Sequence, residues 1–291
     1  MANVAQSILP AKRVTVAARL GRAIRKYFNI FRVSLIERMA YRGDFLLGTI
    51  LRFFPVITTI LLWQAVYAGT ERKSIGGFSE QKMIAYLLLI HISRMFSSMP
   101  GLSGNIARDI REGTIKKYLL QPLDMIGYLL SYRAAHKVAY ITTSAGPYAV
   151  LFLLCSGYFT GLAPDAVTLL AYAASLLLAF VIGFFFETSM GMVGFWFLEV
   201  NSLLWVVNTI NYFVSGQMFP LDMLGPPWDT MLKWMPFQYL AYFPAVVFLG
   251  KVQGWELVEG LLMELCWAVV LIGLSRALFA RGLRRYSAYG G

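Results

Sequence analysis

The chain has 291 residues, of which 58% are hydrophobic and only 14% are charged, with a formal net charge of +11. Soluble proteins of this length seldom combine so little charge with repeated apolar runs of about 20 residues, which excludes an ordinary soluble fold. The basic residues concentrate near the N-terminus, between Gly104 and Lys137, and near the C-terminus. This asymmetry is typical of the cytoplasmic side of a multi-pass membrane protein, so we expect both termini in the cytoplasm and no nucleic-acid partner.

Residues 11–44 form an Arg-rich segment with nine basic side chains. The pattern predicts an amphipathic elbow helix on the inner leaflet, where basic residues interact favourably with anionic membrane lipids. An Arg-rich, acid-poor start is also typical of targeting peptides, but no apolar region with a small-residue cleavage site follows. The apolar residues that recur at a helical period are Leu20, Ile24, Phe28, Phe31 and Leu35.

Six apolar segments predict transmembrane helices, so the expected fold class is an all-α membrane protein. The third segment should begin in the cytoplasm, because Arg133, His136 and Lys137 are too charged for the middle of a bilayer. The fourth is longer than one perpendicular span needs, which predicts either a tilted helix or a break near Gly191–Gly194. In order, the predicted spans are residues 45–67, 82–99, 125–157, 166–198, 203–219 and 257–279.

Apart from Lys82 at the outer end of the second span, three basic side chains fall inside the first two spans. Arg52 lies close enough to the inner boundary to extend its guanidinium toward the headgroups. His91 and Arg94 are three residues apart on one helix face, so both could point into the bundle. The alternative, which we favour for Arg94, is that its side chain reaches the cytoplasmic interface.

The stretch Gly104–Asp124, GNIARDIREGTIKKYLLQPLD, is the longest internal run dense in charge, and apolar segments flank it on both sides. Because a charge at the bilayer centre costs about 2.5–3.5 kcal/mol, this stretch must lie outside the hydrocarbon. Gly113 allows a break, and Pro122 ends the segment. The alternative is a solvated loop that only joins two spans. One face of a helix here could pack, since apolar residues recur at Ile106, Ile110, Ile115, Leu119 and Leu120.

Residues 220–250 are apolar, yet their prolines prevent a continuous span. Dense aromatic residues are typical of a membrane–water boundary. Together these features predict a re-entrant outer hairpin, made of two short helices that dip into the outer leaflet and return. The prolines are Pro220, Pro226, Pro227, Pro236 and Pro244, and the aromatic residues include Trp228, Trp234, Phe237, Tyr239, Tyr242 and Phe243.

The sequence lacks the clustered reactive groups that an enzyme needs. It contains no HExxH, GxSxG or GxxxxGK[ST] motif, so we expect no catalytic site, no bound cofactor or metal, and no loop that hydrolyses ATP. Cys155 and Cys266 lie in apolar runs and are expected to be core residues.

Polar residues within the spans are candidates to line a pathway. For Asn208 and Asn211, hydrogen bonding across helices is the commoner role. The acids could bind protons or cations, but we favour solvated helix ends as their explanation. The acids in question are Glu187, Glu199, Glu259 and Glu264, of which Glu187 is the pathway candidate.

The amphipathic start, the charged stretch after the second span and the proline-broken outer hairpin together resemble the ABC-2 type exporter permeases. The similarity covers essentially the whole chain, and the resemblance implies a single transmembrane domain over residues 1–291 in the bacterial cytoplasmic (inner) membrane. Its main motifs are RDIREGTIKKYLLQP at Arg108–Pro122, SGQMFP at Ser215–Pro220, MPFQYLAYFPAVVFLG at Met235–Gly250, and the tail Gly282–Gly291.

The resemblance also implies partners and roles. In such permeases a coupling helix after the second span docks on a separate ABC ATPase, which binds ATP and Mg²⁺, and a second permease, identical or a sister chain, completes the pathway. The expected function is outward movement of a hydrophobic or amphipathic substrate. The resemblance assigns coupling to Arg108, Asp109, Arg111, Glu112, Gly113 and Lys116, and the outer gate to Pro220, Pro236, Phe237, Pro244 and Gly250.

Two alternatives remain from the residues. An ion-coupled secondary transporter would use the intramembrane carboxylates and work without an ATPase subunit. An integral membrane transferase would need an acid, base or metal cluster.

Overall fold

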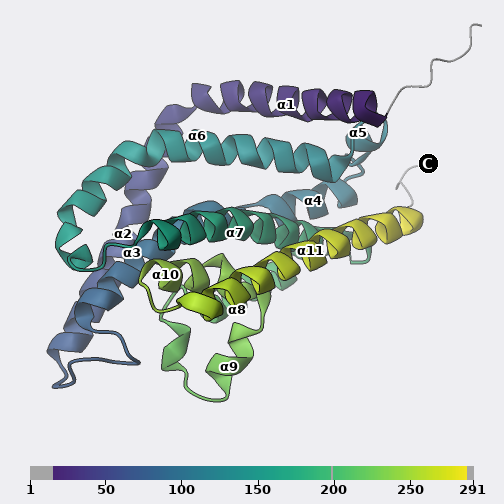
Figure 1. The fold of residues 1–291 in the computed structure, drawn as a ribbon. Helices are drawn as coiled ribbons and strands as arrows, with labels where there is room; N and C mark the ends of the chain where they lie inside the picture. Colours follow the sequence, from purple (N-terminus) through teal and green to yellow (C-terminus); the bar gives the residue numbers. More distant parts are fainter. Residues whose placement is uncertain (1–15, 198, 287–291) are drawn as a thin grey trace, which may run out of the picture.

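The computed structural model describes residues 16–197 and 199–286, and within them the chain is helical, with one isolated β-bridge between Ile75 and Phe78 (Figure 1). The longer helices are α1 (Val16–Ala40), α2 (Arg42–Ala68), α3 (Glu80–Ser97), α4 (Leu102–Arg111), α6 (Met125–Leu154), α7 (Ala166–Met192), α8 (Asn201–Val214) and α11 (Gly254–Arg285). The short ones are α5 (Lys116–Leu119), η1 (Ser156–Phe159), η2 (Val193–Phe195), η3 (Leu221–Met223), α9 (Trp228–Lys233), η4 (Pro236–Leu240) and α10 (Tyr242–Phe248).

Within the described residues, 5 helical segments are long and apolar enough to cross a membrane. The fifth predicted span differs: α8 has 14 residues and is about 21 Å long, shorter than a hydrocarbon core of about 30 Å. It ends early because the chain reverses at Gly216, where φ is +78°, and Tyr86 donates a hydrogen bond to the Gly216 carbonyl (2.6 Å). The membrane-length segments are Leu46–Ala68, Glu80–Arg111, Met125–Leu154, Ala166–Phe195 and Gly254–Arg285.

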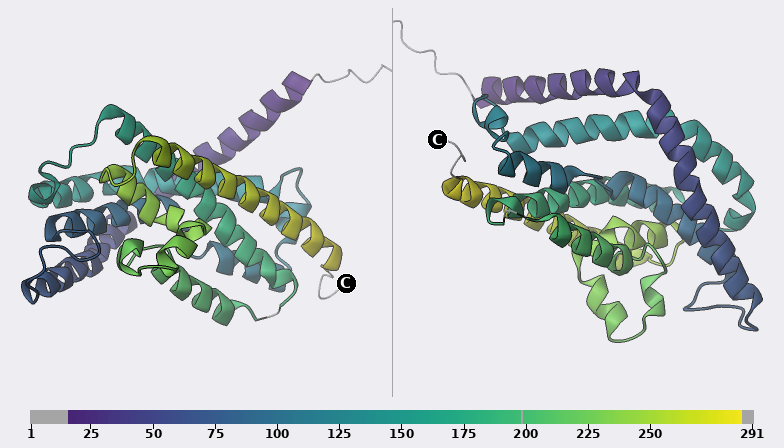
Figure 2. Two further views of the ribbon diagram at one scale, coloured as in Figure 1. Left: turned by 60° about the horizontal axis from the view of Figure 1, so that its bottom comes forward. Right: turned by 180° about the vertical axis from the view of Figure 1, so that it is seen from behind.

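Helix α1 runs alongside the first half of α6, as Figure 1 and the view from behind in Figure 2 both show. The Lys26 ammonium donates to the Pro122 carbonyl (3.1 Å), and the Arg38 guanidinium lies over the Tyr132 ring at 4.8 Å. The predicted elbow helix is therefore helical over the residues that the structure describes, while residues 11–15 of the prediction lie outside them. Helix α1 thus packs against a protein helix, α6, in addition to any contact that it makes with lipid.

Helix α7 lies at the centre of the bundle, between α3 and α4 on one side and α11 on the other. Close approach depends on Gly183, where an added Cβ would lie 2.0 Å from the backbone oxygen of Ser97. Gly282 of α11 likewise allows close packing against Phe195, because a Cβ added at Gly282 would lie 2.2 Å from the Phe195 ring. Small residues at helix crossings let backbones approach, which strengthens packing where lipid supplies no hydrophobic drive.

The end of α7 resolves one alternative left open by the sequence. The α-helix stops at Met192 and continues as one turn of 3₁₀ helix to Phe195, which is the predicted break near Gly191–Gly194. Gly191 and Gly194 lie against the backbone of α4 there, at Ser103 and Ala107. Leu198, the last residue of the predicted span, lies outside the described residues.

Candidate functional site

Helix α4 begins the charged stretch and shows the amphipathic division that the sequence predicts. Its apolar side chains, including Ile106 and Ile110, are buried against α7, whereas Arg108 and Arg111 are exposed. The helix begins at Leu102, two residues before the predicted stretch, because Gly101 takes the left-handed conformation (φ +71°) that turns the chain after α3.

The predicted coupling stretch forms two helices, α4 and α5, and the break falls at Gly113, where the sequence allowed one. Gly113 has φ +76° and its backbone N–H bonds to the Ile110 carbonyl (3.3 Å), which ends α4. Asp109 then closes the turn, because its carboxylate accepts from the Thr114 hydroxyl (2.7 Å) and pairs with Lys117 of α5 (2.9 Å). Partial burial acts against the charge on Lys117, but the Asp109 carboxylate outweighs it and raises the pKa of Lys117.

The other predicted coupling residues face outward around this turn. Glu112 and Lys116 are exposed, and Arg108 donates to the side chain of Asn105 (2.9 Å). Arg111 lies 3.8 Å from Glu199 in the turn before α8, and both side chains are exposed. Exposed pairs of this kind contribute about 0–1 kcal/mol, so these charges are available for other contacts.

The base of α4 is held by two cations of α6. Arg133 donates to the Pro100 carbonyl (3.1 Å), and the Lys137 ammonium donates to the carbonyls of Met95 (2.6 Å) and Ser98. These oxygens lie at the C-terminal end of α3 and in the turn to α4, where helix carbonyls lack intrahelical partners and favour positive charge. The sequence analysis treated Arg133 and Lys137 only as too charged for the bilayer. Their i, i+4 spacing on one helix face is the signal that could have indicated a shared target.

Glu187, a predicted pathway residue, also lies at the base of α4. Its carboxylate faces Ser103 in the first turn of α4 and the guanidiniums of Arg94 and Arg133. A carboxylate at a helix N-terminus is stabilised by the backbone N–H groups there. Arg94 turns toward these groups and donates to Ser97 (3.2 Å), while its predicted reach to the cytoplasmic interface stays a prediction. Four helices, α3, α4, α6 and α7, therefore meet in one polar junction.

The C-terminal end of α11 reaches the same region. An added Cβ at Gly113 would lie 3.5 Å from the Tyr286 hydroxyl, and the Tyr286 ring packs against Phe195 at 6.0 Å. Arg276 of α11 pairs with Asp124, whose side chain caps the N-terminus of α6. The charged turn between α4 and α5 is thus connected to the ends of α6, α7 and α11.

The second predicted site, the outer hairpin, is broken into η3, α9, η4 and α10, so no continuous helix occupies residues 220–250. Pro220 and Pro244 are buried, and Pro236 begins η4. Phe237 packs edge-on against Phe186 of α7 at 5.5 Å, and Gly250 ends α10 with φ +68°.

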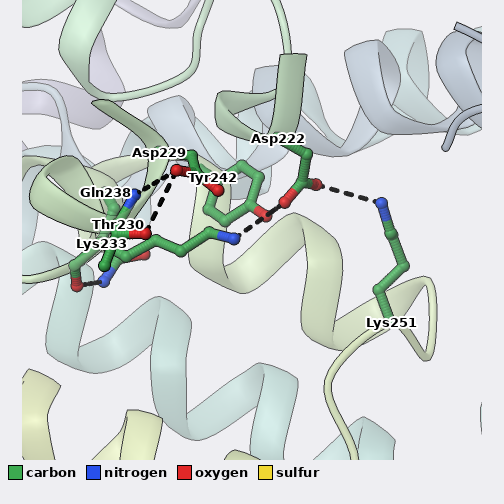
Figure 3. Close-up of polar contacts among 7 residues, drawn as sticks. All are labelled: Asp222, Asp229, Thr230, Lys233, Gln238, Tyr242 and Lys251. Carbon is green, nitrogen blue, oxygen red and sulfur yellow. Dashed lines mark hydrogen bonds and ion pairs between the residues drawn. The ribbon is translucent and has the colours of Figure 1, made fainter. Parts of the chain in front are cut away.

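Asp222 organises this hairpin, and the sequence analysis missed it. Its carboxylate accepts from the Tyr242 hydroxyl (2.8 Å) and from the ammonium groups of Lys233 and Lys251 (3.0 Å each), as Figure 3 shows. Burial alone would raise the pKa of Asp222, but the hydrogen bonds from these three partners outweigh it and hold that pKa below its ordinary value. A cavity of about 400 Å³ lies beside the cluster, between the hairpin and the start of α11.

The two candidate asparagines differ in their surroundings. Asn208 is exposed, whereas Asn211 is buried and its Oδ1 has no hydrogen-bond partner among the described residues. Their role in a pathway stays a prediction. Glu199 and Glu259 are exposed, and their explanation as solvated helix ends stays a prediction, whereas that explanation is wrong for Glu264, which is 0% exposed. Glu264 faces the bundle interior near Ser175 of α7, because α11 packs this face against α7.

The described residues contain no group of three or more His, Cys, Asp or Glu side chains that could hold a metal ion. Membrane-length helices joined by a charged helical turn define a polytopic membrane protein. The sequence profile of the ABC-2 family transporter proteins matches residues 53–290, so the chain belongs to that family. Comparison with curated proteins finds no match.

Proposed function

We propose that this chain is the permease subunit of an ABC exporter, which moves a hydrophobic or amphipathic substrate outward with energy from a separate ATPase. The observation that carries the proposal is the charged turn from α4 to α5. Its exposed face carries Arg111, Glu112 and Lys116, while its buried face and its base are fixed to the ends of the spans. A partner that pushes on this turn therefore moves several helices together.

The rest of the proposal follows the family. ABC-2 permeases generally work with an ABC ATPase, which here would bind ATP and Mg²⁺, and a second permease would complete the pathway. The outer hairpin would gate its external mouth. Both termini would lie in the cytoplasm of a bacterial inner-membrane protein, in line with the basic residues on that side.

The test is a double charge reversal, Arg111→Glu with Glu112→Arg, which keeps the net charge. We expect the co-purifying P-loop ATPase to fall at least about tenfold, because a desolvated charged contact in an interface contributes about 2 kcal/mol or more. The free energy of unfolding of the permease alone should change by no more than about 0.5 kcal/mol, since both sites are exposed.

A matched control is available in the outer loop. Glu71 and Arg72 are also adjacent, exposed and oppositely charged, and Glu71→Arg with Arg72→Glu should leave co-purification unchanged. The complex is purified from native membranes. Peptide mass spectrometry and ATP hydrolysis then measure how much ATPase co-purifies with the permease. If co-purification and transport are undiminished in the Arg111/Glu112 variant, the charged turn is only a solvated linker between two spans.

Glu264 favours a second candidate, an ion-coupled secondary transporter. Both of its carboxylate oxygens are buried without a hydrogen-bond partner among the described residues, and intramembrane acids commonly bind protons or cations. Transport by the purified permease in vesicles that contain no ATPase, driven by a proton gradient and lost in Glu264→Gln, would support this candidate over the first.

A further inference from the structure

Two cavities open on either side of Arg52 in α2, and Arg52 lines both. The first, of about 270 Å³, lies between α2, α3 and the end of α8, and its wall includes His91 and Arg94. The second, of about 210 Å³, lies between α2, α6 and the turn before α4, and its wall includes His136 and Lys137. We call these five residues and the space between them the basic cleft.

Positive charge dominates the surroundings of the basic cleft. Arg38 of α1, Arg52 of α2, Arg94 of α3, and Arg133 and Lys137 of α6 act on one another or on the two histidines by charge repulsion. Glu187 of α7 is the carboxylate that faces Arg94 and Arg133. Several cations gathered at the edge of a bilayer repel one another strongly where the dielectric constant is low, so this arrangement favours an anion between them.

Unsatisfied polar atoms point to the same need. Arg133 is 9% exposed and Lys137 is 8% exposed, so both are nearly withdrawn from water. Nε of Arg133 and Nε2 of His91 are buried and have no hydrogen-bond partner among the described residues. A buried N–H without an acceptor costs about 1–3 kcal/mol, and more where the group is charged. His91 lines the larger cavity, where an anionic acceptor could meet a donor at Nε2, whereas Arg133 lines neither cavity and adds only its positive charge to the surroundings.

The position of the cleft indicates how a ligand would reach it. Arg52 is the seventh residue of the membrane-length segment Leu46–Ala68, which places it about 10 Å along the helix from the inner end. On the proposed topology that depth lies in the inner part of the hydrocarbon core, from which the long Arg52 side chain can extend toward the headgroups. Helix α2 is mostly exposed along this segment, so a lipid-soluble tail has an apolar surface beside the cleft.

The donors identify the anion. Arg52 of α2 approaches the cavity from one side and His136 and Lys137 of α6 from the other, which suits a tetrahedral group with several oxygens better than a planar carboxylate. Guanidinium and ammonium groups are the usual partners of phosphate in proteins. A cavity of about 210 Å³ holds a headgroup and excludes most of a larger molecule.

We propose that the basic cleft binds the phosphate-bearing headgroup of an amphipathic molecule drawn from the inner leaflet, whose hydrocarbon tail lies along α2. The inference rests on the proposed function, because it names the substrate class of that permease. The basic cleft recognises the phosphate alone. Selection of the hydrocarbon tail, and of any group attached to the phosphate, depends on other parts of the permease.

The test measures binding to the purified permease in detergent, without ATPase or ATP. The probes are dioctanoyl phosphatidic acid, the uncharged dioctanoylglycerol, and inorganic phosphate, and the readouts are the dissociation constant and the shift in Tm. We expect phosphatidic acid to bind and raise Tm, dioctanoylglycerol not to bind, and inorganic phosphate to bind at least about tenfold more weakly than the lipid. Equal binding of inorganic phosphate would overturn the amphiphile and make the cleft a free-phosphate site.

Arg52→Gln is the main variant, because Arg52 is exposed and its hydrogen bond and ring contact with α6 are both made to Tyr140, whose hydroxyl it bonds (3.1 Å) and whose ring it covers at 5.0 Å. We expect it to weaken phosphatidic acid binding at least about tenfold, as for the loss of one charged hydrogen bond, with Arg52→Lys restoring part of the affinity. Arg25→Gln, an exposed cation of α1, is the matched control and should bind as wild type does. Equal losses in Arg25→Gln and Arg52→Gln would mean general surface attraction and overturn the site.

The two proposals fail separately. If phosphatidic acid binds through Arg52 but no ATPase associates with the charged turn, the cleft stands and the exporter proposal falls. If the ATPase associates and Arg52→Gln does not alter lipid binding, the exporter proposal stands and the cleft falls.

Discussion

Asp222 shows how much one side chain can determine in a segment without regular structure. Its partners are 11, 20 and 29 residues away along the chain, in α9, at the start of α10, and after α10. Each hydrogen bond to a charged group contributes about 1.5–3 kcal/mol to stability, before the entropy that the segment loses on ordering is subtracted. The folded form of the outer hairpin therefore depends on this carboxylate.

Asp222→Asn should loosen the hairpin, because a neutral amide leaves both lysines without a countercharge. We expect hydrogen exchange over residues 220–250 to rise, with a local cost of about 1–3 kcal/mol. Asp229→Asn is the control, since Asp229 bonds only to its neighbour Thr230 among the described residues and should change exchange little. Equal exchange in the two variants would contradict the role given to Asp222.

The pH dependence has a definite sign. The pKa of Asp222 in the folded chain is below its ordinary value of 3.8, so its contribution to stability is complete above that value and is lost as pH falls through the folded pKa. The protection factors of residues 220–250, which are exchange rates corrected for the intrinsic effect of pH, should stay constant in wild type from pH 7 to about pH 5 and fall only below about pH 4. Asp222→Asn should show no such fall.

At the scale of elements, the helices were predictable and several of their contacts were not. Charge density and flanking apolar runs located α4, and the glycines near Gly191 located the break after α7. The short α8 was not predictable, because what ends it is a hydrogen bond from Tyr86, 130 residues away. The cations at the base of α4 were visible as residues, but their carbonyl targets on α3 carry no sequence signal. Asp222 was missed because a loop has no periodicity to mark it.

The crossing of α7 over α3 gives a prediction for this scale. Gly183→Ala should lower stability by about 1–3 kcal/mol, since the new Cβ would lie 2.0 Å from the Ser97 oxygen and backbone cannot move aside cheaply. Gly273→Ala in α11 is the control: nothing lies within 4 Å of its Cβ position, so it should be neutral or stabilising by up to about 1 kcal/mol. Thermal unfolding in detergent measures both. Similar Tm shifts in the two variants would contradict the close crossing.

At the scale of the whole molecule, the charged turn, the start of α1 and the end of α11 gather at one end, while the loop between α2 and α3 lies at the other (Figures 1 and 2). This arrangement agrees with the basic residues of the sequence and places the predicted coupling residues and the chain ends on one side.

Cysteine labelling tests the side. In a background with Cys155→Ala and Cys266→Ala, Lys73→Cys in the outer loop should react with a membrane-impermeant maleimide added to intact cells. Lys116→Cys in α5 should react only after the membrane is opened, because both positions are exposed and differ only in the compartment that they face. Labelling of Lys116→Cys from outside would invert the proposed topology.

The packing of α1 on α6 has a consequence for biosynthesis. Lys26 and its acceptor at Pro122 are 96 residues apart, so at about 5–20 residues per second the ribosome needs roughly 5–20 s to supply the partner. During that interval α2 and α3 leave the ribosome while α1 has no helix to pack against. On the proposed topology, the inner leaflet would then shelter its apolar face, and its arginines would interact with anionic headgroups there. Arrival of α6 lets α1 exchange a lipid contact for a protein one, so assembly of the N-terminal region is ordered by translation.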